Sequence, residues 1–169
     1  SDPKFGTIGV FDGENKIVPS LAAPGFCKAI GQFPKSVDLA GFAYGGSVPT
    51  AIKMVVRSRT PTYQGFKFGF RGKGIPKTSI FGGGSFKAGF SMNGTDPSLF
   101  QEVTIPMAKF SYDWSGFTGD CNTKDPARGL NQQHYCCSGS GESPSKDSVC
   151  PSAKYLKDIS DVEIWAEGA

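Results

Sequence analysis

The sequence is short of histidine. His134 is the single histidine among 169 residues, and it lies in a polar stretch. Catalysis by Ser-His-Asp or Cys-His groups requires a base that is held rigidly against the nucleophile. We therefore interpret His134 as a solvated loop residue, and we expect the protein not to be an enzyme.

Long apolar runs are also missing. No run approaches the ~20 residues that a bilayer-spanning helix needs, so we expect a protein that is peripheral to a membrane and does not span it. No signal or transit peptide is visible at Ser1. We therefore expect that any targeting segment has been removed or was never part of this chain.

Positive charge is not concentrated in one segment. The 18 basic and 15 acidic residues are interspersed and leave a net charge of +3. The nearest approach to a basic cluster is Lys67, Arg71, Lys73 and Lys77, which we assign to the solvated face of a strand pair and its turn. A nucleic-acid binder would gather its positive charge on one face, so we expect no nucleic-acid partner.

Glycine, proline and phenylalanine are abundant instead. The 23 glycines and 12 prolines exceed one fifth of the chain, and both residue types oppose helix interiors. The 14 phenylalanines supply large apolar side chains. This composition predicts many short strands joined by tight turns, in one domain that spans residues 1–169.

The clearest strand covers residues 65–71, where three phenylalanines alternate with lysine, glycine and arginine. Period-two alternation places the rings on one face, as in a half-buried antiparallel strand. Residues 51–59 are the expected hairpin partner, with Ile52, Met54 and Val56 facing inward.

Further short strands are expected along the chain. They are residues 9–11, 16–18, 26–30, 39–44, 86–90, 103–105 and 162–166, and residues 152–157 are expected to form one or two helical turns. Seven to nine short strands at this spacing indicate an all-β fold, a β-sandwich of jelly-roll type.

The segment from residue 120 to residue 151 differs from the rest of the chain. It is rich in small and polar residues and contains four of the five cysteines, Cys121, Cys136, Cys137 and Cys150. Adjacent cysteines are hard to bridge to each other, so Cys136 and Cys137 are each expected to pair with Cys121 or Cys150. Either pairing gives a loop insertion closed by two disulfides, which implies an oxidising compartment.

Metal motifs do not fit the sequence. A zinc site would show a C-x2-C pair or a Cys/His pair at ligand spacing, and His134 two residues before Cys136 does not provide one. Asp113, Asp120 and Asp125 offer oxygen ligands for calcium but fit no EF-hand register. We therefore expect no metal and no cofactor.

Tyr44, Tyr63 and Trp114 are the candidate contacts for a ligand or a partner. Exposed rings on a β-sandwich can stack against sugars, so a carbohydrate-binding module is one hypothesis for the function. The alternative is that Tyr63 and Trp114 pack in the core or at its rim.

Several short stretches match one known family, in one order. They are Leu21-Ala22-Ala23-Pro24-Gly25-Phe26, Val56-Arg57-Ser58, Tyr63-Gln64-Gly65-Phe66, Glu102-Val103-Thr104-Ile105-Pro106 followed by Phe110, Asp113-Trp114, and Ile164-Trp165-Ala166-Glu167-Gly168. On these stretches the chain resembles the complex I intermediate-associated protein family, in its algal form. The resemblance covers most of residues 9–168.

The resemblance implies a galactose-binding-like jelly roll, similar to carbohydrate-binding modules, in a non-enzymatic protein. Members of the family assemble or maintain large membrane complexes, respiratory in mitochondria and photosynthetic in plastids. We therefore expect an accessory or assembly subunit whose partners are protein subunits of such a complex. The thylakoid lumen of a plastid is the favoured location, because the cysteine-rich loop argues against the reducing mitochondrial matrix; a mitochondrial or a secreted location is the alternative.

The chain departs from the family at both ends. The family has a further strand before Gly9 and another after Gly168, and neither is present. Terminal strands of such sandwiches often lie side by side, so their joint loss would expose sheet edges. We expect either a fragment of a longer chain or a partner that covers the edge.

Overall fold

The structure is a computed structural model that describes residues 4, 6–21, 23–42, 48–77, 84–125, 131–137 and 149–168. Its strands are β1 (Ile17–Val18), β2 (Ala23–Pro24), β3 (Phe26–Val37), β4 (Ala51–Val56), β5 (Phe66–Gly72), β6 (Ser85–Gly89), β7 (Gln101–Pro106) and β8 (Ile159–Glu167). Its short helical elements are η1 (Pro19–Leu21), η2 (Ala40–Phe42), η4 (Met107–Lys109) and α1 (Ala153–Leu156).

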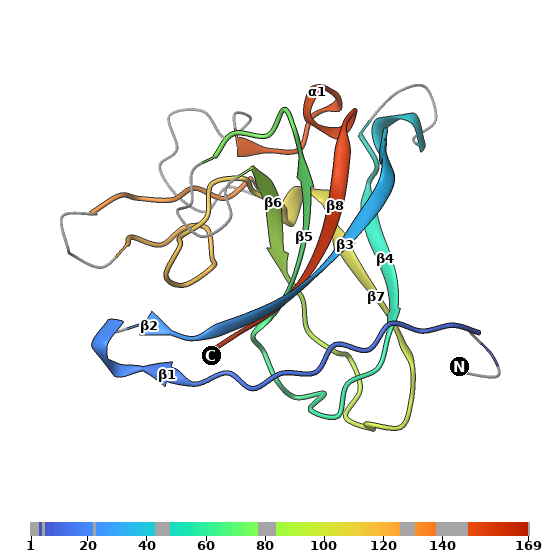
Figure 1. The fold of residues 1–169 in the computed structure, drawn as a ribbon, viewed down its shortest axis with the longest axis vertical. Coiled ribbons are helices and arrows are strands. Elements are labelled where there is room, and N and C mark those ends of the chain that lie inside the picture. Colours follow the sequence, from blue (N-terminus) through green and yellow to red (C-terminus); the bar gives the residue numbers. More distant parts are fainter. Residues whose placement is uncertain are drawn as a thin grey trace.

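Two antiparallel sheets form the body of the molecule (Figure 1). The larger sheet has the strand order β3-β8-β5-β6, the smaller sheet consists of β4 and β7, and β1 and β2 form a separate pair. In Figure 1 the long strand β3 crosses the molecule diagonally beside β8. This arrangement confirms the predicted all-β sandwich. Among the described residues, no helix is long and apolar enough to cross a membrane.

The hydrophobic core lies between the two sheets. Phe68 and Phe70 point into it from β5, Phe86 from β6, and Val103 and Ile105 from β7, and each of these side chains is at most 8% exposed. They follow the alternation predicted for their strands. Burial of each such side chain contributes about 1.5–3 kcal/mol, and this burial holds the sheets together.

β4 does not pair with β5, so the predicted hairpin between residues 51–59 and 65–71 is wrong. β4 pairs with β7, while β5 lies between β8 and β6. Ile52, Met54 and Val56 pack against the core, as predicted. Two strands with alternating apolar side chains can pair side by side in one sheet, or they can face each other across the core from different sheets. The alternation is the same in both cases, so it does not identify the pairing partner.

Two predicted strands in the first part of the chain are not strands. Residues 9–11 belong to no sheet, and the described part of residues 39–44 contains η2 instead. Gly41 N donates a hydrogen bond to Asp38 Oδ1 at 3.0 Å, so the side chain of Asp38 stabilises a turn at this point. The other predicted strands are confirmed, with β3 extending to Val37, and α1 confirms the predicted helical turn.

The second face of the larger sheet is buried as well. Lys67 is 7% exposed and Lys87 is 4% exposed, although both alternate with core phenylalanines or alanine along their strands. The assignment of Lys67 to a solvated face is therefore wrong, and Arg71 is only one third exposed. Lys73 and Lys77 are exposed, as predicted. The reason is a segment between β7 and α1 that lies over this face and supplies partners for its charges.

Candidate functional site

The candidate site is the face of the larger sheet opposite the hydrophobic core. Because side chains alternate along a strand, the register decides which of them share this face. They are Asp161, Glu163, Trp165 and Glu167 on β8, Lys67 and Arg71 on β5, Lys87 on β6 and Lys28 on β3. An acidic central strand thus lies between strands that carry bases. We call these residues the outer-face cluster.

Lys87 is at the centre of the outer-face cluster. Its ammonium group lies 3.8 Å from the ring centroid of Trp114 and 3.7 Å from that of Trp165, and it donates a hydrogen bond to Glu167. Burial lowers the pKa of Lys87 to about 8, and the nearby Glu167 opposes this shift in part. Two aromatic faces and a carboxylate therefore replace the water around a buried cation.

The other charges of the cluster are paired in the same way. Lys67 contacts Asp120 and lies 3.5 Å from Glu167 Oε2, and Arg71 contacts Glu163. The four bases Lys28, Lys67, Arg71 and Lys87 meet the four acids Asp120, Asp161, Glu163 and Glu167. The charges of the ionised groups therefore cancel, and the outer face forms a second, polar core.

The segment 114–120 closes over the cluster. Trp114 Nε1 donates a hydrogen bond to Ser85 O at 3.1 Å, which fixes the ring beside Lys87. Gly119 has a φ of +68° and lies against the carboxylate of Glu167, where any larger residue would collide. The cavity that remains has a volume of about 10 Å³, which is room for roughly one water molecule. In this conformation the part of the outer face around Lys87 is closed to larger ligands.

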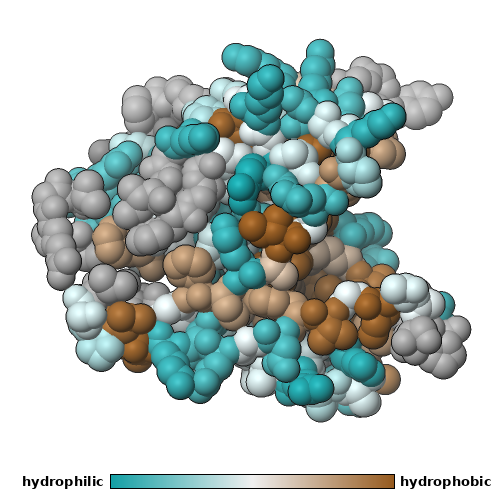
Figure 2. All heavy atoms as spheres, viewed as in Figure 1, coloured by the Kyte–Doolittle hydropathy of each residue, from teal (hydrophilic) through white to brown (hydrophobic). Residues whose placement is uncertain are grey.

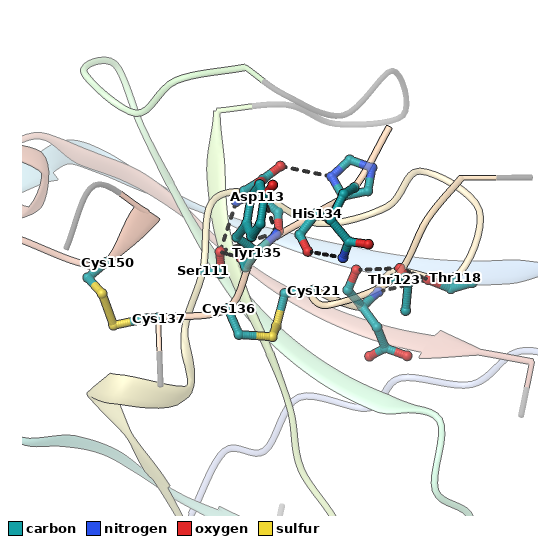
Figure 3. The surroundings of a disulfide bond; sticks show 12 residues. Ser111, Asp113, Thr118, Cys121, Thr123, His134, Tyr135, Cys136, Cys137 and Cys150 are labelled. Atoms are coloured by element: carbon teal, nitrogen blue, oxygen red, sulfur yellow. Dashed lines mark hydrogen bonds and ion pairs between the residues drawn. A yellow bond between two sulfur atoms is a disulfide. The ribbon is translucent and has the colours of Figure 1, made fainter. Parts of the chain in front are cut away.

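Two disulfides hold the loop that follows. Cys121 pairs with Cys136, and Cys137 pairs with Cys150. This result confirms that the adjacent cysteines pair with the outer ones, and it selects one of the two predicted connectivities. Figure 3 shows the two bonds close together, near the contact between Asp113 and the ring of His134.

His134 is buried, so its predicted place as a solvated loop residue is wrong. Its side chain is 1% exposed, with Nδ1 2.8 Å from Asp113 and Nε2 3.0 Å from Asp125 (Figure 3 shows the first contact). Tyr135 N also donates to Asp113, and the hydroxyl of Ser115 donates to Asp125. Both ring nitrogens can donate only when the imidazole is protonated. We call His134, Asp113 and Asp125 the histidine clamp; it joins the end of the disulfide loop to the segment beside β6.

The histidine clamp predicts that stability falls as the pH rises. Burial lowers the pKa of His134, but the hydrogen bonds and charges of Asp113 and Asp125 outweigh burial, so the pKa lies above its usual value of 6.5. The stability that a raised pKa contributes is complete below the unfolded-state pKa and is lost as the pH rises through the folded-state pKa. We expect urea unfolding to give a lower free energy at about pH 8 than at about pH 5.5, and His134→Gln to abolish this fall and leave only the small opposite change that the lowered pKa of Lys87 contributes near pH 8. Equal pH dependence in both proteins would contradict the clamp.

The three predicted contact residues do not gather on one surface. Tyr44 lies outside the described residues. The hydroxyl of Tyr63 contacts Glu167 O and accepts a hydrogen bond from Asn15 Nδ2 at 3.0 Å, and Trp114 is 2% exposed. Tyr63 and Trp114 thus pack against the protein, as the second interpretation of them expected, and the ring of Trp114 is not available to a sugar in this conformation.

Asp113, Asp120 and Asp125 do not converge on an ion. Asp113 and Asp125 flank His134, whereas Asp120 contacts Lys67. Across the described ranges, no group of three acidic, histidine or cysteine side chains is arranged so that it could hold a metal ion. These carboxylates instead stabilise neighbouring cations.

A wider hollow opens at the side of the sandwich, between the end of β6 and β7. It has a volume of about 410 Å³ and is open to solvent, and Lys67, Gly89, Thr104, Lys109 and Asp120 are among its lining residues. Lys67 and Asp120, which contact each other, both line it. This hollow therefore offers polar contacts but no deep apolar pocket.

The arrangement of the outer face favours a structural role over a catalytic role. Its charges neutralise one another, its rings surround a lysine of the same chain, and its covering segment is held by the disulfide loop and the histidine clamp. Comparison with models of protein families, with curated proteins and with solved structures found no match.

Proposed function

We propose that the protein is a non-enzymatic accessory or assembly subunit that docks onto a membrane-bound photosynthetic or respiratory complex, without itself crossing the membrane. The observation that carries this proposal is a group of exposed apolar side chains on one side of the sandwich. Phe26 and Ile30 on β3 are 42% and 44% exposed, and Ile17 on β1 is 78% exposed. Figure 2 shows apolar side chains gathered across the middle of this side. Such a patch favours contact with another protein.

The outer-face cluster supports the same proposal indirectly. Its charges and rings are engaged within the protein, so the edges and loops of the sandwich are the surfaces left for a partner. The sequence resemblance to a family of assembly proteins points in the same direction.

The two disulfides support an oxidising compartment for this function. We propose the thylakoid lumen of a plastid as the first choice, with an oxidising mitochondrial space or the cell exterior as the alternatives.

Migration on a native gel tests the proposal. The full chain, tagged and expressed in its own cells, is expected to migrate with one large complex after mild detergent extraction of the membranes. A protein that migrates only at the position of its own monomer would overturn the proposal. Fractionation of thylakoid and mitochondrial membranes distinguishes the photosynthetic from the respiratory partner.

A glycan array provides the contrasting measurement. A carbohydrate-binding module would need exposed rings, and Trp114 is buried. We therefore expect that the protein binds no glycan through these rings. Replacement of Tyr63 or Trp114 with alanine should then abolish no binding on the array. A glycan signal that either substitution abolishes would favour carbohydrate binding over docking to a complex.

A further inference from the structure

The edge strand β3 has backbone groups that point away from the sheet. β3 pairs with β8 on one side, and no strand within the described residues pairs with it on the other. Gly168 N donates to Gly25 O at 2.9 Å, and hydrogen-bonded pairs alternate along an antiparallel ladder. The backbone amides and carbonyls of Lys28, Ile30 and Gln32 therefore face away from β8.

Only one half of this edge carries features that prevent strand addition. Between Gln32 and Val37 the register with β8 is irregular, Pro34 lacks an amide hydrogen, and Lys35 is exposed. A bulge, a proline and a charge are the usual protections of a sheet edge. Residues 26–32 have a regular register and no proline. Within it, residues 28–32 face no other strand in the described part of the chain, so we treat them as open to an added strand.

The side chains of this part of β3 indicate which side chains an added strand would need. On the core side Ala29 and Gly31 are small and exposed, and Val162 beneath Gly31 is only half-buried. Bulky apolar side chains on an added strand would cover this surface. On the outer side Ile30 is 44% exposed and offers a further apolar contact.

The charged side chains of β3 are all basic. Lys28 and Lys35 are its charged residues, and residues 26–37 contain no acid. Lys28 is partly occupied, because its ammonium group lies 3.8 Å from Glu163 and 4.6 Å from the ring centroid of Trp165. Lys35 has an exposed side chain just beyond residues 28–32, so a carboxylate at the end of a partner strand would be favourable there.

We propose that an extended strand of a partner subunit pairs with residues 28–32 of β3, with bulky apolar side chains at alternate positions and a carboxylate next to Lys35. This inference rests on the proposed function and names the contact through which docking occurs. Backbone hydrogen bonds would supply the affinity and the alternate side chains the specificity.

Gln32→Pro tests the backbone contact. The amide of Gln32 faces away from β8, so proline removes the hydrogen bond to a partner strand but none of the ladder to β8. Gln32→Ala is the matched control, because it shortens the side chain and keeps the amide. On native gels of solubilised membranes we expect the share of protein in the large complex to fall about tenfold for Gln32→Pro and to stay near the wild-type level for Gln32→Ala. Equal thermal unfolding of the purified variants would confirm that both fold.

The outcomes separate this inference from the proposed function. A wild-type protein that migrates alone overturns the proposed function. If the wild type migrates with the complex and Gln32→Pro does so equally, the β3 contact is overturned and the proposed function stands. Lys35→Glu should weaken the association; stronger association would overturn the acidic character of the partner strand. A dimer by light scattering that Gln32→Pro dissociates would assign the edge to a second copy and overturn the partner strand.

Discussion

Replacing Lys87 with methionine is expected to lower the free energy of unfolding by about 3 kcal/mol. The substitution keeps most of the side-chain volume but removes the cation between Trp114 and Trp165 and leaves Glu167 buried with one partner fewer. A buried carboxylate that loses its partner retains the cost of leaving water. Urea unfolding at about pH 7, followed by tryptophan fluorescence, measures the effect and reports on the two rings at the same time.

The exposed ion pair of Lys53 and Glu102 is the matched control. Its charged atoms are 3.1 Å apart, but the side chains are 67% and 59% exposed, so Lys53→Met should change stability by about 0.5 kcal/mol or less. A double-mutant cycle of Lys87→Met with Glu167→Gln should show a coupling energy of about 1–3 kcal/mol. Similar small effects of both lysine substitutions would contradict the interpretation of the outer face as a second core.

Removal of the bond between Cys121 and Cys136 is expected to cost about 3 kcal/mol, on the chain-entropy estimate for a loop of this size. The two cysteines are neighbours of Asp120 and Tyr135, which contact Lys67 and Asp113 respectively. The double variant Cys121→Ala/Cys136→Ala should therefore loosen the covering segment as well as destabilise the fold. Thermal unfolding and the access of a fluorescence quencher to Trp114 measure the two effects separately.

The second disulfide provides the comparison. Cys137 and Cys150 join the loop to the residues just before α1, so Cys137→Ala/Cys150→Ala should lower the unfolding temperature without exposing Trp114. If the two double variants expose Trp114 equally, the covering segment is not held by the bond between Cys121 and Cys136.

The sequence predicts the layers of this fold better than their connections. Alternating phenylalanines on β5 and β6 identify the core face because period-two burial is a local property of a strand. The pairing of β4 with β7 depends on how the turn after β4 carries the chain from one sheet to the other, and the inward positions of Ile52 and Met54 are compatible with either partner. Cysteine spacing likewise leaves two connectivities, and the position of the loop on the sheet decides between them.

The outer-face cluster could be predicted only in part. Asp161, Glu163 and Glu167 lie at alternate positions on β8, and Lys67 and Arg71 do so on β5. This complementary charge pattern could have predicted that the two strands are neighbours. The sequence does not predict that segment 114–120 covers this face, because its glycines and polar residues resemble those of any exposed loop. The same holds for His134, whose burial depends on two aspartates that lie 21 and 9 residues away in the chain.

A photo-reactive amino acid placed on β3 gives the most direct test of docking through this edge. Incorporated at Gln32 in the native membranes, it should cross-link the protein to one subunit of a large complex, whereas incorporation at the exposed residue Glu102 on β7 should not. Cross-linking at Gln32 alone is the predicted result. Cross-linking at Glu102 without any at Gln32, in a protein that still migrates with the complex, would contradict it.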